Sequence, residues 1–162
     1  MALSVEPITP DIMQRPPRGR KEGFFTRRAL FFGIGIGALI AIQGLIVFLY
    51  GLNTSLIKGQ TMVFCLITIS EMFNAFNWRS DRVSLFKLGF FTNKPLISAV
   101  IITVLLQILV VYAPFLQKPF NTTALNLTDW FLIVLLGSIT LIFMEGVKFI
   151  EKRRRKNNVI NQ

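Results

Sequence analysis

Four long apolar segments, separated by polar and charged stretches, dominate the hydropathy pattern of the chain. They lie at about residues 29–50, 61–78, 95–112 and 130–149. As helices they measure roughly 27–33 Å, enough to cross a hydrocarbon core of about 30 Å. Four short strands could not close a barrel, and unpaired backbone is not tolerated in lipid. The pattern predicts an all-α membrane protein, with a four-helix transmembrane bundle at 29–149 between a proline-rich basic loop (1–28) and a basic tail (150–162).

Composition supports this class of protein. The 162 residues are 52% hydrophobic and 16% charged, whereas a soluble domain carries about a quarter charged residues. The chain has no histidine and a single cysteine, Cys65 in an apolar segment, so no intrachain disulfide or zinc site is expected. The first 28 residues are polar and basic and have no secretory signal pattern.

The net charge of +10 follows from where the basic residues stand. Lys and Arg number six before the first segment, then one, four and one in the connections, and six at the end of the chain. This alternation predicts four spans with both termini cytoplasmic. It also accounts for the basic balance without nucleic acid, so the expected partner is the lipid bilayer and no nucleic acid. The run "EKRRRKNN" is interpreted as an anchor beside anionic lipid.

Glu71 is a carboxylate in the second apolar segment, where a charge is costly and indicates function. At about 100° per residue, Ser70, Glu71, Asn74 and Asn77 share one helical arc, and all four present oxygen atoms. Hard cations prefer such ligands. Glu71 is therefore the main candidate cation (metal) ligand, with Asn74 and Ser70 as weaker candidates. Alternatively, Glu71 lies near the headgroups or is protonated. One carboxylate is too few for calcium, so other ligands would come from elsewhere.

Other polar residues in the segments have simpler interpretations. Glu145 and Lys148 stand three apart, which predicts an intrahelical ion pair. Gln43 and Gln107 are lone amides, for which an interhelical hydrogen bond is the expected role. A row of small residues in the first segment predicts a packing face for another helix: Gly33, Gly37 and Ala41.

Helix ends and loops carry their own signals. Pro95 predicts the first turn of the third helix, and Thr128 or Asp129 is the expected N-cap of the fourth. Three N-x-Ser/Thr sequons, at Asn53, Asn121 and Asn126, fall in loops predicted to face outward; they matter only in a secreting eukaryote. The sequence has no glycine-rich phosphate loop, no nucleophile–histidine arrangement and no metal cluster, so no catalytic residue is predicted.

Several stretches resemble the C-terminal transmembrane region, the seventh to tenth helices, of P-type cation-transporting ATPases of the calcium-pump branch. "PDIMQRPPR" resembles the loop between the sixth and seventh helices, and "SEMFNAFNWRSD" resembles the eighth helix and the loop after it. "LQILVVYAPFLQKPFNTTALNLTDW" resembles the ninth helix and the approach to the tenth, and "MEGVKFIEK" the end of the tenth. The resemblance covers nearly the whole chain in the correct order.

The resemblance implies specific roles. Glu71 occupies the position of a glutamate that contributes to a calcium site, completed by helices that this chain lacks. The proline-rich loop would dock on the phosphorylation domain through Pro10, Asp11, Arg15, Pro16, Pro17 and Arg18. The phosphorylated aspartate motif and the nucleotide-binding parts are absent from the sequence, so the chain is not expected to be an enzyme on its own. It looks like the C-terminal quarter or less of a pump, and Met1 corresponds to an interior position of the family pattern.

The expected function is a helical scaffold that contributes one carboxylate to an intramembrane cation site. No cofactor is expected in this chain. Calcium or another cation would be the transported ligand, with ATP and magnesium used only by the complete pump. Partners would be the remaining helices and cytoplasmic domains of the pump, in a cell membrane if bacterial and in an endomembrane or plasma membrane if eukaryotic. The alternative is a stand-alone four-helix membrane protein, such as a channel or a pump-derived regulatory subunit.

Overall fold

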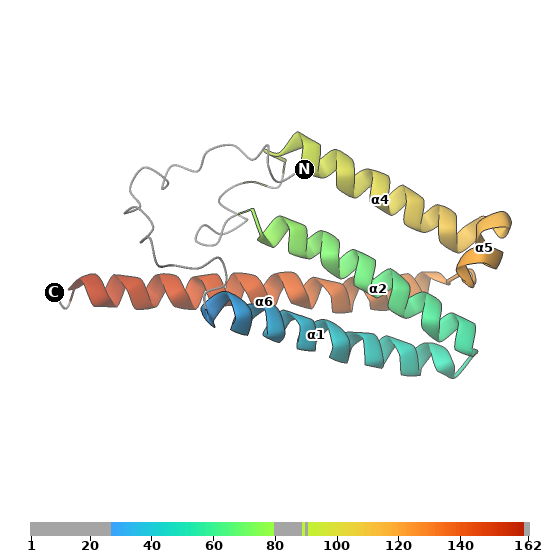
Figure 1. Ribbon diagram of the computed structural model, residues 1–162, viewed down its shortest axis with the longest axis horizontal. Helices are drawn as coiled ribbons and strands as arrows, with labels where there is room; N and C mark the ends of the chain where they lie inside the picture. The colour runs from blue at the N-terminus through green and yellow to red at the C-terminus, as the bar shows by residue number, and fades with distance from the viewer. Residues whose placement is uncertain (1–26, 80–88, 90, 161–162) are drawn as a thin grey trace.

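The structure is a computed structural model that describes residues 27–79, 89 and 91–160. The predicted docking loop, Pro10–Arg18, lies outside these residues. The described part contains helices and no strand (Figure 1): α1 (Arg27–Leu52), α2 (Leu56–Asn77), α4 (Lys94–Tyr112), α5 (Pro114–Phe120) and α6 (Leu127–Ile160).

Four of these helices are long and apolar enough to cross a membrane, and they agree with the four segments of the sequence pattern. The spans are Gly33–Leu52, Leu56–Asn77, Lys94–Tyr112 and Leu127–Ile150. The predicted fold class, an all-α membrane protein with four transmembrane helices, is confirmed. α6 continues beyond its span to Ile160, so the helix extends into the basic tail.

α2 is the central helix of the bundle (Figure 1). It packs along both α1 and α6, whereas α4 makes only a narrow contact with α2. Buried apolar side chains from α1, α2, α4, α6 and the approach to α6 form the core: Val47, Met62, Cys65, Leu66, Val111, Leu125 and Ile133. This core lies in the half of α2 nearer to its first residue. The second half of α2, which carries Glu71, is therefore held mainly by other contacts.

The bundle has two different ends (Figure 1). The short-loop end carries the α1–α2 turn, α5 and the start of α6. The basic end carries the last turn of α2 and the first turn of α4. Lys148 of α6 also lies there, because its Nζ bonds to the carbonyl of Asn77 at the end of α2. α2 and α6 run in the same direction, from the short-loop end to the basic end.

The structure confirms one predicted helix end and corrects another. Pro95 lies in the first turn of α4, as expected. The N-cap prediction for Thr128 or Asp129 is wrong, because α6 already begins at Leu127. Asp129 is the third helical residue, and its Oδ2 accepts a hydrogen bond from the N–H of Asn126 at 2.8 Å. This is the back-bonding half of a capping box, so the aspartate stabilises the helix start from inside the first turn.

The close approach of α1 and α2 uses glycines other than those expected. A Cβ at Gly51 would lie 2.6 Å from the Cα of Gly59, so the two backbones touch. Gly33 and Gly37 have nothing within 4 Å of a Cβ, and Ala41 is exposed. The expected packing face on α1 is thus not used by the described residues of this chain.

Candidate cation site

Glu71 lies on an exposed face of α2, about two turns before the helix ends. Gln60, Phe64 and Ile67 are also exposed and stand 11, 7 and 4 residues before it, so the four share one stripe of the helix. A carboxylate turned towards hydrocarbon alone is unfavourable by several kcal/mol. Phe64 and Ile67 suit a lipid-facing surface, so Glu71 is the residue of this stripe whose exposure needs a partner.

The rest of the expected oxygen-bearing arc faces the inside of the bundle. Ser70, Asn74 and Asn77 are 0%, 8% and 1% exposed. A Cβ at Gly137 of α6 would lie 3.5 Å from the Ser70 Oγ, which places this side chain against α6. The structure thus divides the arc, with Glu71 at its exposed edge and the two weaker candidates buried.

Several side-chain atoms in this buried row have no hydrogen-bond partner among the residues that the structure describes. They are the Ser70 Oγ, the Asn74 Oδ1, and both the Oδ1 and Nδ2 atoms of Asn77. Buried polar groups of this kind carry a desolvation cost until a partner satisfies them. The row nevertheless provides no second carboxylate, and the described residues hold no group of three His, Cys, Asp or Glu side chains suited to a metal ion. Glu71 can supply one charged ligand, not a complete site.

Lys148 joins α6 to the basic end of α2. Its Nζ lies 3.2 Å from the Glu145 Oε1, which confirms the predicted ion pair. The same Nζ donates a hydrogen bond to the backbone carbonyl of Asn77 at 3.0 Å. The sequence analysis did not foresee this second contact, since it joins residues 71 positions apart.

Arg79 links the same end of α2 to the residues that precede α4. Its Nη1 donates to the carbonyl of Gly89 at 2.7 Å, and its Nη2 donates to the Thr92 Oγ1 at 2.6 Å. Gly89 has a φ of +79°, a conformation that glycine adopts without the steric penalty of a side chain. Arg79 is one of the four basic residues of the second connection, and it is buried.

A second ion pair connects α2 and α6 at the short-loop end. The Lys58 Nζ lies 3.0 Å from the Asp129 Oδ2, with side chains 14% and 1% exposed. Sequence reasoning missed this pair because its members belong to helices separated by α4 and α5. Together with Lys148, it fixes α2 to α6 near both ends.

The two lone glutamines make the interhelical hydrogen bonds expected of them. The Gln107 Nε2 donates to the Cys65 Sγ at 3.0 Å, joining α4 to α2. The Thr140 Oγ1 donates to the Gln43 Oε1 at 3.3 Å, joining α6 to α1. Both glutamines are buried, and these hydrogen bonds between helices account for their presence in the apolar segments.

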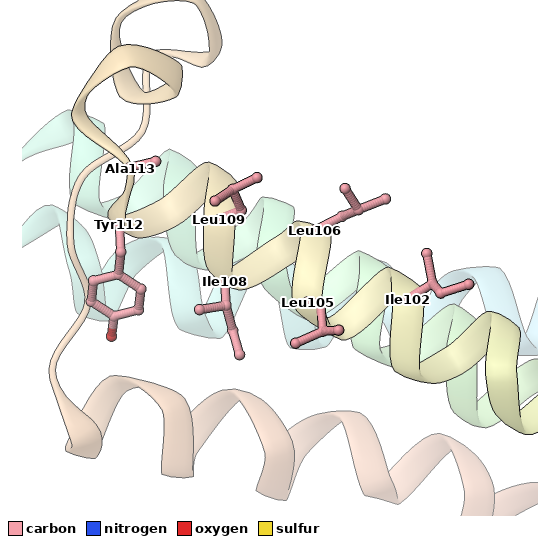
Figure 2. A pocket seen from close by; sticks show the side chains of 7 residues that line it. All are labelled: Ile102, Leu105, Leu106, Ile108, Leu109, Tyr112 and Ala113. Atoms are coloured by element: carbon pink, nitrogen blue, oxygen red, sulfur yellow. The ribbon is translucent and has the colours of Figure 1, made fainter.

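The hollow beside α4 has no chemistry suited to a cation. It measures about 710 Å³ and is lined by Ile102, Leu105, Leu106, Ile108, Leu109, Tyr112 and Ala113. Figure 2 shows these apolar side chains spread along α4, with Leu105, Ile108 and Tyr112 on one side of the helix. The Tyr112 hydroxyl is already used, as it donates to the carbonyl of Leu125 at 2.6 Å and accepts from the Trp130 Nε1 at 2.9 Å.

All three sequon asparagines lie exposed at the short-loop end: Asn53 in the α1–α2 turn, Asn121 after α5 and Asn126 before α6. Asn121 has a left-handed backbone, with φ 50° and ψ 50°, and its Nδ2 lies 3.4 Å from the Gln60 Oε1. The structure therefore places the sequons on one side of the bundle.

These features define a class: an integral membrane helical bundle that presents a carboxylate on one exposed helix face. The chain also matches the family described as "Cation transporting ATPase, C-terminus" over residues 1–150. It belongs to this family and forms the C-terminal membrane domain. This finding favours the pump-domain interpretation over a stand-alone membrane protein.

Similar proteins include "Calcium-transporting ATPase 1" of Yarrowia lipolytica, 35% identical over 99% of this chain and 18% of the relative. "Calcium-transporting ATPase 1" of Bacillus cereus is 33% identical over 94% of the chain and 19% of the relative. Human "Calcium-transporting ATPase type 2C member 1" is 34% identical over 96% of the chain and 17% of the relative. The chain thus spans less than one-fifth of the length of these curated relatives.

Proposed function

We propose that the chain is the membrane scaffold of a calcium-transporting ATPase and that Glu71 supplies one charged ligand to its intramembrane cation site. The observation that carries this proposal is the exposed carboxylate on a membrane-spanning helix of a domain from this family. Calcium is the favoured ion because the relatives named above are calcium-transporting ATPases.

The exposed stripe of α2 gives the proposal its geometry. Glu71 lies at the exposed edge of the arc that it shares with the buried row, so its carboxylate is available to helices outside the chain. Calcium takes six to eight oxygen ligands in general, and the described residues offer only one carboxylate at this position. The remaining helices of the pump would cover the stripe and complete the ligand set.

Asn74 and Ser70 have a smaller role in this proposal. Both are buried towards the interior of the bundle, and each has an atom without a hydrogen-bond partner. They border Glu71 on the helix surface and would tune its surroundings or accept water from the site. The predicted docking loop remains part of the proposal as a contact with the phosphorylation domain.

The chain by itself is not an enzyme in this scheme. ATP and magnesium would be used by the cytoplasmic parts of the complete pump, and this domain would contribute the ligand and the fixed framework. Transport would then depend on movements of the other helices relative to the framework.

The test is Glu71→Gln in the complete pump that contains this domain. The substitution keeps size and removes charge, so we expect the calcium concentration for half-maximal ATP hydrolysis to rise by about tenfold or more, since calcium affinity depends on ligand charge. Glu145→Gln is the matched control, because it makes the same chemical change at a glutamate paired with Lys148. Its effect is expected to be much smaller, because the glutamine amide oxygen can still accept a hydrogen bond from the Lys148 Nζ. Equal and negligible effects of the two variants would show that Glu71 is not a ligand.

A further inference from the structure

Lys148 is a buried cation outside the candidate site, and its contacts explain how it is tolerated. The residue is 6% exposed. Its Nζ lies 3.0 Å from the carbonyl oxygen of Asn77 and 3.2 Å from the Glu145 Oε1. A buried ammonium group is strongly unfavourable without such partners. Through these two contacts, the Lys148 ammonium group links the Glu145 carboxylate of α6 to the backbone of α2.

The Asn77 carbonyl is a suitable acceptor because of its place in α2. The last four carbonyls of a helix have no intrahelical donor, and Asn77 is the last residue of α2. A lysine at this point supplies the missing hydrogen bond and a charge that complements the negative end of the helix dipole. α6 therefore caps the basic end of α2.

This contact restrains the backbone of α2 more directly than the buried polar row does. Unpaired atoms on Ser70, Asn74 and Asn77 show that this row does not fix the rotation of α2 through a full set of hydrogen bonds. The hydrogen bond from the Lys148 Nζ is instead made to a main-chain atom, the carbonyl oxygen of Asn77. Glu71 stands six residues before Asn77, about 9 Å along the same helix. A slide or rotation of the last turn would therefore change the direction of the Glu71 carboxylate.

We propose that Lys148 is a positioning residue for the cation site: through the Asn77 carbonyl it holds the basic end of α2 against α6 and sets the direction of Glu71. It is not a ligand, since its Nζ is itself a cation and already contacts the Asn77 carbonyl and the Glu145 carboxylate. The inference rests on the proposed function, because Glu71 must bind the cation for its direction to matter.

The experiment compares Lys148→Met with Arg153→Met in the complete pump. Both variants remove one positive charge from α6, but Arg153 is exposed and lies over the Phe149 ring instead of contacting α2. ATP hydrolysis is measured against calcium concentration. For Lys148→Met the half-activating concentration should rise by about fivefold or more, the usual size of coupling between sites, with little change in maximal rate. Arg153→Met should leave both values unchanged.

Two further variants distinguish positioning from general disruption. Lys148→Arg keeps the charge and the N–H donors, so its calcium affinity should stay close to that of the unchanged pump. Lys148→Gln keeps N–H donors without the charge, so its calcium affinity should fall between those of Lys148→Arg and Lys148→Met. If the Lys148→Met variant does not accumulate as a folded pump, the proposal is tested by comparing Lys148→Arg with Lys148→Gln. Equal half-activating concentrations for these two would overturn the proposal.

Glu71→Gln is measured in parallel, so that the two proposals can fail separately. If Glu71→Gln raises the half-activating concentration and Lys148→Met does not, the positioning role is wrong and the proposed function stands. If Glu71→Gln has no effect, both are wrong. A lower maximal rate for Lys148→Met at an unchanged calcium dependence would also overturn the positioning role.

Discussion

Glu71 and Glu145 are both glutamates on membrane-spanning helices, yet their surroundings give them different chemistry. Glu145 lies 3.2 Å from the Lys148 ammonium, which neutralises its charge inside the bundle. Glu71 lies on an exposed face of α2, where a cation and helices outside the chain can reach it. At this scale, function depends on which face of a helix a carboxylate occupies and on whether a basic residue lies within reach.

Asp129 shows how one side chain can stabilise both a helix end and a helix pair. Its Oδ2 accepts from the Asn126 N–H and also lies 3.0 Å from the Lys58 Nζ. We expect Asp129→Ala to lower the free energy of unfolding by about 3 kcal/mol, because it leaves a partly buried ammonium without its partner. Asp129→Asn should cost less, since the amide oxygen can still accept the backbone hydrogen bond.

Thermal unfolding of the chain in detergent micelles measures both Asp129 variants. Thr128→Ala is the control, because Thr128 is exposed in the same turn. If Asp129→Ala unfolds at the same temperature as the control, the ion pair between α2 and α6 contributes nothing to stability.

At the scale of helices, α2 is fixed to its neighbours by different means along its length. Near its start it lies against α1 through Gly51 and Gly59 and is joined to α6 by Lys58 and Asp129. Near its end it is held by Lys148 from α6 and by its own Arg79. α2 is thus anchored on both sides of Glu71, which fits the proposed role of this residue as a ligand held by a fixed framework.

Gly51→Ala tests the close contact between α1 and α2. The added methyl would lie 2.6 Å from the Cα of Gly59, so the helices must separate. We expect a loss of about 1–3 kcal/mol in the free energy of unfolding, the usual cost of overpacking. Gly37→Ala is the matched control on the same helix, where a methyl meets open space. Its stability in micelles should be unchanged or slightly higher, given the better helix propensity of alanine. The contact would be disproved if the two variants unfolded alike.

At the scale of the whole molecule, the two ends of the bundle differ in their basic residues, and the short-loop end has Lys118 and Lys58, the latter paired with Asp129. The basic end carries Arg79, Lys94 and Lys148, and the long α6 extends beyond it as a basic helix. The short-loop end carries the exposed sequon asparagines. The orientation predicted from these basic residues, in which the basic end faces the cytoplasm, stays a prediction.

The orientation is tested by single cysteines in a Cys65→Ala background. N53C and R153C place a thiol at exposed positions of the two ends. In sealed vesicles of one orientation, an impermeant maleimide added outside should label only one variant, and the other should react only after permeabilisation. With right-side-out vesicles the labelled variant should be N53C. Labelling of both variants without permeabilisation, or of R153C alone, would contradict the predicted topology.

The sequence by itself determined the four membrane-spanning helices and their membrane character, but not the short α5. Runs of apolar residues long enough to span a bilayer predict helices regardless of how these pack, because lipid requires every backbone hydrogen bond to be satisfied within the segment. The Glu145–Lys148 pair was equally predictable, since residues three apart on a helix are neighbours. Gln43 and Gln107 were expected to bond to other helices, but the sequence could not name their partners.

Only the tertiary structure decided which helix faces meet. The small-residue row at Gly33 and Gly37 had the pattern of a packing face, yet the chain uses Gly51 and Gly59, because a close approach depends on how two helices cross. The shared arc of Glu71, Asn74 and Ser70 was correct as geometry of one helix, and the position of α6 divided it into an exposed carboxylate and a buried row. Contacts such as Lys148 with the Asn77 carbonyl join residues far apart in the chain, and a local pattern carries no information about such distances.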